Sequence, residues 1–372
     1  MTTLMRREWL ILGVYVFFIA VIFTPVQAEM TPDQAEFLMH KVLGTASCAT
    51  SGCHGGAGPL RGAVATFTRE DPHGRSYGTL ATPRSARMGE ALGIADVRTS
   101  ASCTVCHAPA ASVPEGLRGD DLRVEDGVGC SSCHDSAESW LRTHTRPELD
   151  HAAKVAAGMR DLRSAHARAN ACVACHQVIE PRLVETGRHP RLIFELDGQL
   201  AAEPAHWREV HGWDGAKAWL VGQAVAWREV KAARADGRDT LAGAAERELA
   251  LAWLVARAGG GRVDGLVADA VARRADTDWP AGEGEAVLRR LAGAGEDFRA
   301  AEVSRLEQAY RAERLVLGLD RVVAAWPERA RAKAAEPVLA RLFKAAQSVP
   351  DFEPAGFAVL LDEFSRLVGG SN

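Results

Sequence analysis

The eight cysteines of this chain form four close pairs, and a histidine directly follows the second cysteine of each pair. Three pairs have the spacing C-x-x-C-H, in "CTVCH", "CSSCH" and "CVACH", whereas the first pair, in "CATSGCH", has four residues between its cysteines. The motif residues are Cys48, Cys53 and His54; Cys103, Cys106 and His107; Cys130, Cys133 and His134; and Cys172, Cys175 and His176. One recurring pattern therefore uses every cysteine in the chain.

The pattern C-x-x-C-H is the attachment motif of covalent c-type haem. Two thiols about one helical turn apart can each form a thioether with one of the porphyrin's two vinyl groups, and the adjacent imidazole then binds the iron. We therefore expect four covalently attached c-type haems. The first motif keeps the adjacent Cys-His pair and lengthens only the loop to the first thioether, so we interpret it as the fourth haem site. A free thiol pair or a disulfide is the alternative there.

The cysteine pairs also fit two structural roles, a zinc site and a set of disulfides. The second and third pairs together resemble a four-cysteine zinc ribbon when the histidines are ignored. An even cysteine count in an exported protein is typical of disulfides. Neither role predicts a histidine after the second cysteine of every pair, so we favour haem.

Several of the remaining histidines have a local sequence that suits a second axial ligand. Asp71 and Pro72 are typical of an N-cap and first helical residue, which would aim the next histidine rigidly. A proline after one candidate restricts its backbone to extended conformations, and Trp207 beside another can pack on a porphyrin. The mature chain has few methionines, so bis-histidine ligation is the expectation. The candidate ligands are His73, His144, His189 and His206.

The N-terminus has the layout of a secretory signal peptide: a basic start, the apolar run "WLILGVYVFFIAVIFT" and a small-residue site ending at Ala28. We expect cleavage there, with residues 1–28 as the signal peptide and a periplasmic or otherwise exported mature protein that is soluble. The alternative is retention of this segment as a membrane anchor, which is the only membrane contact expected. The formal net charge of -4 argues against a nucleic-acid partner.

The positions of the chemistry-bearing residues divide the rest of the chain in two. Every cysteine and histidine precedes residue 212, so residues 29–212 are predicted to form a tetrahaem domain in which porphyrins replace much of the apolar core. From Trp213 onward, apolar residues recur at helical spacing, which predicts a helical bundle over residues 213–372 that serves as a scaffold or docking domain. The expected fold class is mainly α with few regular strands.

The haem-binding half resembles the multihaem cytochromes of the cytochrome c-554 kind. The likeness is carried by "EDGVGCSSCH" at the third motif, the histidine of "DPHGRSY" and the histidine of "WLRTHT", and it covers roughly residues 45 to 195. The resemblance implies closely stacked haem pairs that move electrons between periplasmic redox partner proteins. The widened first motif and the long helical C-terminal half depart from this family.

The same resemblance implies a set of second ligands. It assigns His144 to the haem on His54 and His73 to the haem on His134. For the haem on His176 a later histidine serves in the family, and His189 is the choice here, with His206 and His211 in reserve. The haem on His107 can lack a second protein ligand in this family.

Three functions follow from these residues. The leading one is a periplasmic electron carrier with closely packed, mostly bis-histidine haems and no catalytic residues. The alternative is an oxidoreductase that acts on a small nitrogen or oxygen species at a five-coordinate haem on His107. A third possibility is an electron-transfer subunit of a larger respiratory complex.

Overall fold

The computed structural model describes residues 40–58, 61–209, 213–261, 267–300, 302–347 and 351–369. The chain divides into two compact units, Met1–His40 and Lys41–Asn372, and all helices named below belong to the second. The predicted signal peptide, residues 1–28, and His211 lie outside the described residues. None of the helices in the described ranges is long and apolar enough to cross a membrane.

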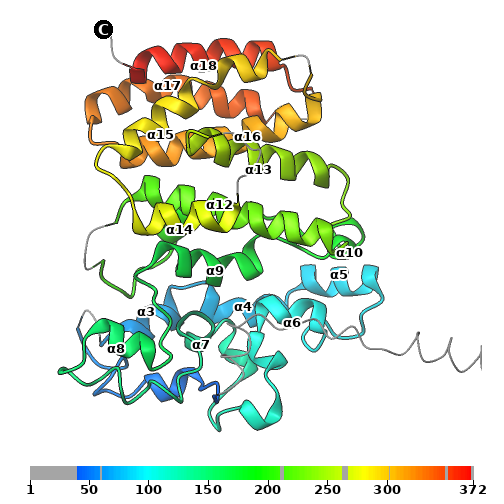
Figure 1. The fold of residues 1–372 in the computed structure, drawn as a ribbon. Helices are drawn as coiled ribbons and strands as arrows, with labels where there is room; N and C mark the ends of the chain where they lie inside the picture. The colour runs from blue at the N-terminus through cyan, green and yellow to red at the C-terminus, as the bar shows by residue number, and fades with distance from the viewer. Residues whose placement is uncertain are drawn as a thin grey trace, which may run out of the picture. The chain divides into compact units, whose positions relative to one another are not determined.

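The described part of the chain is helical, which confirms the mainly α fold class (Figure 1). It contains no strand in the described residues, and the nearest feature to one is an isolated bridge between Val42 and Arg118. The α-helices are α3 (Ala63–Arg69), α4 (Ser76–Thr79), α5 (Pro83–Leu92), α6 (Ala101–His107), α7 (Cys130–His134), α8 (His151–Ala156), α9 (Ala165–His176), α10 (Pro181–Glu185), α11 (Leu196–Ala202), α12 (Gly215–Ala235), α13 (Ala244–Ala258), α14 (Ala268–Thr277), α15 (Glu283–Ala292), α16 (Arg305–Ala325), α17 (Arg329–Ala346) and α18 (Pro354–Gly369).

Helices before residue 213 are short, and 3-10 turns alternate with them. The 3-10 turns are η1 (Thr45–Cys48), η2 (His73–Arg75), η3 (Pro109–Ser112), η4 (Glu115–Leu117) and η5 (Val124–Asp126), with η6 (Ala294–Phe298) later in the chain. Local sequence sets the ends of α5: the Thr82 hydroxyl accepts from the Ser85 N–H, Pro83 occupies the first turn, and Gly93 at φ 67° ends the helix. Such short elements hold loops and motif residues rather than a large apolar core.

The helices after residue 213 are longer and bury their apolar faces against one another. Helix α12 packs on α13 and α14, α13 on α16, and α16 on α17, which packs on α18. Figure 1 shows these helices in successive layers above α9. Trp219 of α12 is fully buried and lies against Gly318 of α16, where any Cβ atom would overlap the indole ring. The periodic apolar residues thus form the bundle core that the sequence predicts.

Helix α9 joins the two regions, because it packs against the bundle core and also carries the fourth motif at its end. Ala165, Ala169 and Val173 belong to the same apolar core as α12, and α9 packs directly on α12 and α14. The other end of α9 carries the fourth motif, and Cys172 packs against the bundle core. The apolar core is therefore continuous across residue 212, and the domain division proposed there stays a prediction.

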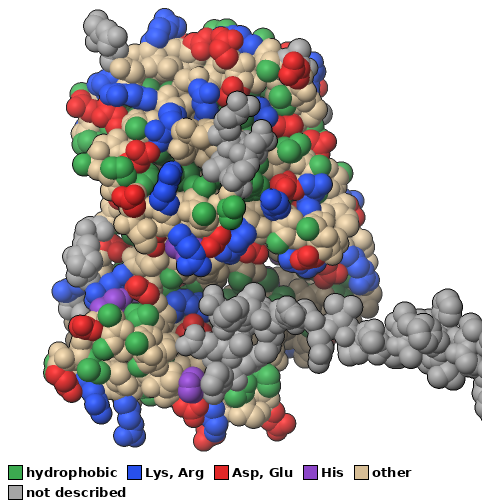
Figure 2. Space-filling model, in the orientation of Figure 1, with side chains coloured by type: hydrophobic (Ala, Val, Ile, Leu, Met, Phe, Trp, Pro, Cys, Tyr) green, Lys and Arg blue, Asp and Glu red, His purple; other side chains and the backbone are tan. Residues whose placement is uncertain are grey.

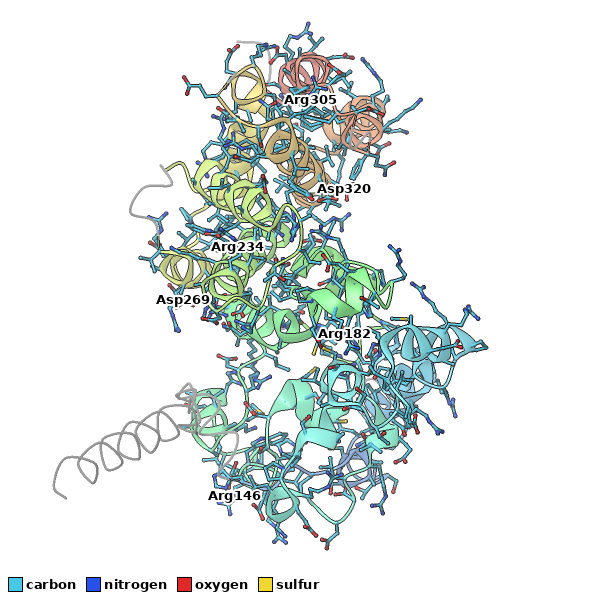
Figure 3. All side chains as sticks on the ribbon, turned by 90° about the vertical axis from the view of Figure 1, so that its right-hand side faces the viewer. Arg146, Arg182, Arg234, Asp269, Arg305 and Asp320 are labelled. Atoms are coloured by element: carbon cyan, nitrogen blue, oxygen red, sulfur yellow. The ribbon has the colours of Figure 1, made fainter. Side chains whose placement is uncertain are left out.

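Side-chain contacts join short helices to one another and also join α9 to the long helices. Arg182 of α10 donates to the Leu92 carbonyl at the end of α5 and lies where the short helices meet the long ones (Figure 3). On the outer side of the bundle, Asp269 of α14 accepts from His166 and from Arg228. Lys and Arg side chains are interspersed with Asp and Glu over the long helices in Figure 2. The contact between His166 of α9 and Asp269 of α14 therefore ties the helix that carries the fourth motif to the bundle.

Candidate haem-binding sites

Each of the three C-x-x-C-H motifs ends a helix. His107 is the last residue of α6, His134 of α7 and His176 of α9. The α-helical repeat pairs each N–H with the carbonyl four residues earlier, so it brings the histidine N–H to the first cysteine of its motif. All eight cysteines are free thiols in the structure.

The first motif reaches the same arrangement by a different route. Helix geometry cannot pair His54 with Cys48, which lies six residues earlier, yet the His54 N–H donates to the Cys48 carbonyl at 3.1 Å. The additional residues form a tight turn in which the Cys53 N–H donates to the Thr50 carbonyl at 2.9 Å. Gly55 is needed beside it, because a Cβ atom there would overlap the Ala49 carbonyl. The turn thus accommodates the additional residues, and the histidine N–H still bonds to the carbonyl of the first cysteine, as in the shorter motifs.

The end of α7 is held by a charged contact. Asp135, directly after His134, has φ 74° and ψ 179°, a conformation that normally requires glycine. Arg160 stabilises it by an ion pair of 3.0 Å with the Asp135 carboxylate and by a hydrogen bond of 3.2 Å to the Ser132 carbonyl. This clamp stops the helix at the histidine and fixes the direction of its side chain.

Cysteines from different motifs lie next to one another. The Cys48 thiol shares a hydrogen bond with Cys130, which raises the pKa of Cys48 and lowers that of Cys130 to about 7. Cys106 and Cys175 share a second such bond, and Cys133 and Cys172 are electrostatic neighbours. These contacts connect the first motif to the third, the third to the fourth, and the fourth to the second.

Three motif histidines face a histidine from elsewhere in the chain. The ring centroids are 6.3 Å apart for His54 and His144, with 14° between the planes. They are 6.4 Å apart for His107 and His189, and 5.9 Å apart for His73 and His176. Two imidazoles that bind one metal ion from opposite sides have centroids about 6 Å apart, because a metal–imidazole bond is about 2 Å long and each nitrogen lies about 1.1 Å from its ring centroid. These pairs fit a c-type haem iron between them.

The remaining motif histidine, His134 of the third motif, has His206 as its strongest electrostatic neighbour. Burial lowers the pKa of His134 to about 4, with further lowering by His206 and then His54. Burial is also the main reason that the pKa of His206 is lowered. Burial therefore favours the neutral form of both imidazoles, which is the form that binds metal. Arg168 holds the loop of His206, because its guanidinium forms two hydrogen bonds, of 2.7 and 3.1 Å, with the Glu209 carboxylate.

Hydrogen bonds orient three of the paired imidazoles. His73 donates from Nδ1 to the Asp71 carboxylate at 3.0 Å, and His189 donates from Nδ1 to the Pro190 carbonyl at 2.8 Å. The Nδ1 of His107 lies 3.0 Å from the Thr79 hydroxyl oxygen, whose own proton goes to the Ser76 carbonyl. A bound Nδ1–H leaves Nε2 unprotonated and available as a metal ligand. This donor set matches axial histidines of haem.

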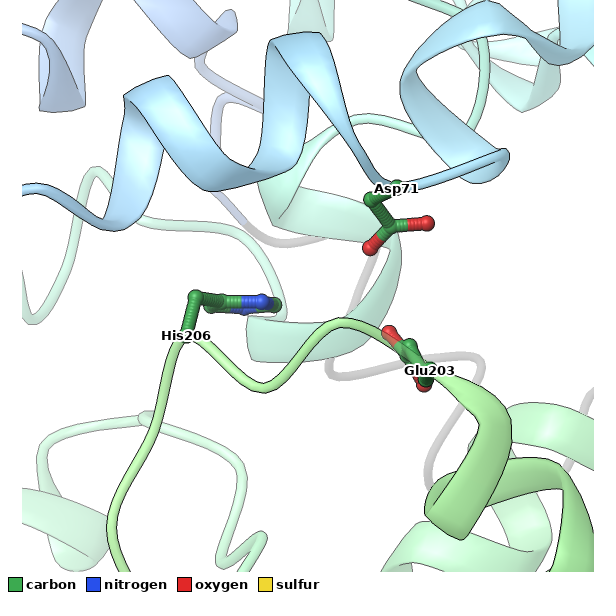
Figure 4. Close-up of side chains that lie close together, drawn as sticks. All are labelled: Asp71, Glu203 and His206. Atoms are coloured by element: carbon green, nitrogen blue, oxygen red, sulfur yellow. The ribbon is translucent and has the colours of Figure 1, made fainter.

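Two acidic side chains, Asp71 and Glu203, lie close to His206 (Figure 4). One ligand atom each of Asp71, Glu203 and His206 lies within 4.8 Å of the others. Asp71 follows α3, and Glu203 and His206 come from the end of α11 and the loop after it. Burial and the adjacent Asp71 raise the pKa of Glu203 to about 7. Burial opposes ionisation of Asp71, but its hydrogen bonds from His73 outweigh this effect and lower its pKa.

The pairing of histidines differs from the one implied by the family resemblance at two sites. His73 faces His176 rather than His134, and His189 faces His107 rather than His176. The placement of His144 opposite His54 agrees with that implication. The difference arises because α9 turns its last residue toward η2, a contact between distant segments. His151 and His166 instead bond to Asp161 and Asp269.

Sequence reasoning does not identify the residues that orient these imidazoles. The sequence presents Asp71 only as a helix cap and does not single out Arg168, which is buried. Nothing in the sequence distinguishes Thr79. The spacing D-P-H contains a usable signal, because a carboxylate two residues before a histidine can reach its Nδ1 as well as its backbone N–H.

The four cysteine–histidine motifs and the facing imidazoles define a c-type cytochrome. Residues 47–135 match the family described as cytochrome c554 and c-prime, and this match supports a c-type cytochrome with covalently bound haem and an electron-transfer role. The match covers the first three motifs. No curated protein and no solved structure matches the chain.

Proposed function

We propose that the chain is an exported, periplasmic tetrahaem cytochrome that relays electrons between redox partner proteins. Each motif would hold one haem through its two cysteines and its histidine. The second axial ligands would be His144, His189, His206 and His73 for the haems on His54, His107, His134 and His176. When bound, the haems supply reversible one-electron oxidation and reduction.

The observation that carries this proposal is the spacing of the imidazole pairs. Three pairs have ring centroids 6.3, 6.4 and 5.9 Å apart, although their members come from different segments. Iron with two imidazole ligands has no open position for a substrate, so such haems suit electron transfer. The pair of His107 and His189 supports a carrier over an enzyme with an open iron at the second motif.

The contacts between cysteines support a linear order of haems. Thioethers formed by Cys48 and Cys130 would attach two porphyrins at adjacent edges, and Cys106 and Cys175 would do the same for another two. Cys133 and Cys172 connect these two sets. The order of sites would be first, third, fourth and second. Electrons would then enter at one end site and leave at the other.

Carbon monoxide tests the choice between carrier and enzyme, because it binds only ferrous haem with an open position. We expect the reduced wild-type protein to give no carbon monoxide difference spectrum. The variant His189→Ala should bind about one equivalent, and the matched control His151→Ala should bind none, since His151 bonds to Asp161.

Binding of one equivalent by the wild type would favour the enzyme with a five-coordinate haem. Isolation of the protein in a stable complex with membrane subunits would favour the third possibility, a subunit of a respiratory assembly. No binding by the wild type, together with one equivalent in His189→Ala, would support the carrier.

A further inference from the structure

The proposed second ligands differ in what their Nδ1 atoms contact. His73 donates to a carboxylate, that of Asp71, at 3.0 Å. His189 donates to a neutral carbonyl at 2.8 Å. The Nδ1 atoms of His144 and His206 are buried and have no hydrogen-bond partner among the described residues. His73 is thus distinguished from the other three by an anionic acceptor.

Asp71 is held firmly in place for this contact. Its side chain is 1% exposed, and one oxygen accepts both the backbone N–H of His73 at 2.8 Å and the ring Nδ1–H. The Glu203 carboxylate lies 3.8 Å from the same Nδ1 and limits movement on the other side. The backbone of His73 is fixed in turn, because its carbonyl accepts from the Val128 N–H and from the Ser76 hydroxyl. The imidazole therefore has one orientation.

A carboxylate that accepts the Nδ1–H of a metal-binding histidine makes the imidazole a more basic ligand. Hydrogen bonds to an ionised acceptor are roughly twice as strong as those between neutral groups. Greater donation from the ligand stabilises ferric iron more than ferrous iron, and second-shell hydrogen bonding is one of the means by which proteins set haem potential. The effect should be largest where the contact is buried, as at Asp71.

We propose that Asp71 is a positioning residue that lowers the reduction potential of the haem bound by His73 and His176 below the value that a neutral acceptor would give. This inference rests on the proposed function, because it requires both histidines to bind one iron. In the proposed order of sites, this haem is internal. Electrons would therefore reside on the haems to either side of it rather than on the fourth site.

The test removes the negative charge of Asp71 and keeps a hydrogen-bond acceptor at the same position. Asp71→Asn retains a side-chain oxygen that can accept from the His73 N–H, and Asp71→Ser retains a hydroxyl that can accept from the same N–H. The matched control is Asp161→Asn, which neutralises a carboxylate bonded at 2.7 Å to His151, a histidine that faces no motif histidine. A potentiometric titration followed by absorption and electron paramagnetic resonance gives the midpoint of each haem in the full-length holoprotein.

Both Asp71 variants should favour reduction of one haem about tenfold, which raises its midpoint potential by about 59 mV for one electron. The midpoint potentials of the other haems should stay near their wild-type values. The control should move none. If all four haems remain low-spin in the variants and no midpoint moves, the inference is overturned and the proposed function stands. Loss of a haem or of its low-spin signal in both variants would assign Asp71 a purely structural role and also overturn it. A wild-type protein without a low-spin haem on His176 would contradict the proposed function itself.

Discussion

The regions before and after residue 212 have the same fold class but different sources of stability. The long helices share an apolar core, to which the described residues before Trp213 contribute the buried side chains of Ala165, Ala169, Val173, Phe194 and Leu196. The haem-binding region has short helices and scattered buried side chains, and its described histidines are half-buried. The long helices can be stabilised by their own side chains, whereas few buried apolar side chains hold the short helices together. This contrast indicates that covalent haem supplies the missing core of the first region.

The most severe test of this contrast is to remove every attachment site. A full-length variant with all eight cysteines replaced by serine should lose all haem, because no thioether can form. We expect residues 41–209 to become sensitive to protease while α12 to α18 stay resistant. Limited proteolysis followed by mass spectrometry measures both regions in one experiment. Equal resistance of the two regions in the haem-free chain would contradict the difference in stability described above.

The opposite perturbation acts on the bundle alone. Trp219→Ala should destabilise the protein by about 3–5 kcal/mol, the usual cost of deleting a fully buried aromatic side chain. Haem content and the absorption spectrum should stay unchanged. Val359→Ala is the matched control, because Val359 is 61% exposed and surface changes usually cost less than about 0.5 kcal/mol. Denaturation followed by circular dichroism measures the difference, and a loss of haem in Trp219→Ala would show that the regions are not independent.

A smaller effect on stability is expected from Glu195, which lies just before α11. Burial raises the pKa of Glu195 from 4.5 to about 7, although its carboxylate accepts from the Asp197 N–H at 3.0 Å. The native chain therefore keeps the Glu195 proton in a range where the unfolded chain has released it, so stability falls as pH rises from about 4.5 to 7. At about 1.36 kcal/mol for each unit of pKa, the loss is at most about 3 kcal/mol.

Glu195→Gln should remove this pH dependence, since an amide does not titrate. The measurement is the denaturation midpoint of both proteins at several pH values between about 4 and 8. Asp96→Asn is a suitable control, because Asp96 is partly exposed and bonded only to Arg98 and its immediate neighbours. Parallel curves for the wild type and Glu195→Gln would show that another group causes the slope.

Sequence patterns predict the elements of this protein better than its long-range contacts. The apolar period after Trp213 predicts the bundle, and α12 (Gly215–Ala235) begins two residues after this position. The motif histidines can be identified because covalent attachment requires local spacing. The pairing of His73 with His176 cannot be obtained in this way, since it depends on how α9 packs between α12 and the short helices.

The widened first motif shows the same limit on a smaller scale. Its sequence predicts a longer loop, but not that the His54 N–H returns to the Cys48 carbonyl. That contact depends on a turn in which Gly55 packs against backbone. The likeness to a known family supplies second ligands, and it agrees with the structure only at His144.

In the proposed function, four covalent haems each lie between two imidazoles. Quantitative electron paramagnetic resonance of the oxidised wild-type protein, together with a haem count from intact mass, measures both the ligation and the number of haems. We expect four haems per chain and low-spin ferric signals that account for all of them. Fewer than four haems, or a high-spin ferric signal of one or more equivalents, would contradict it.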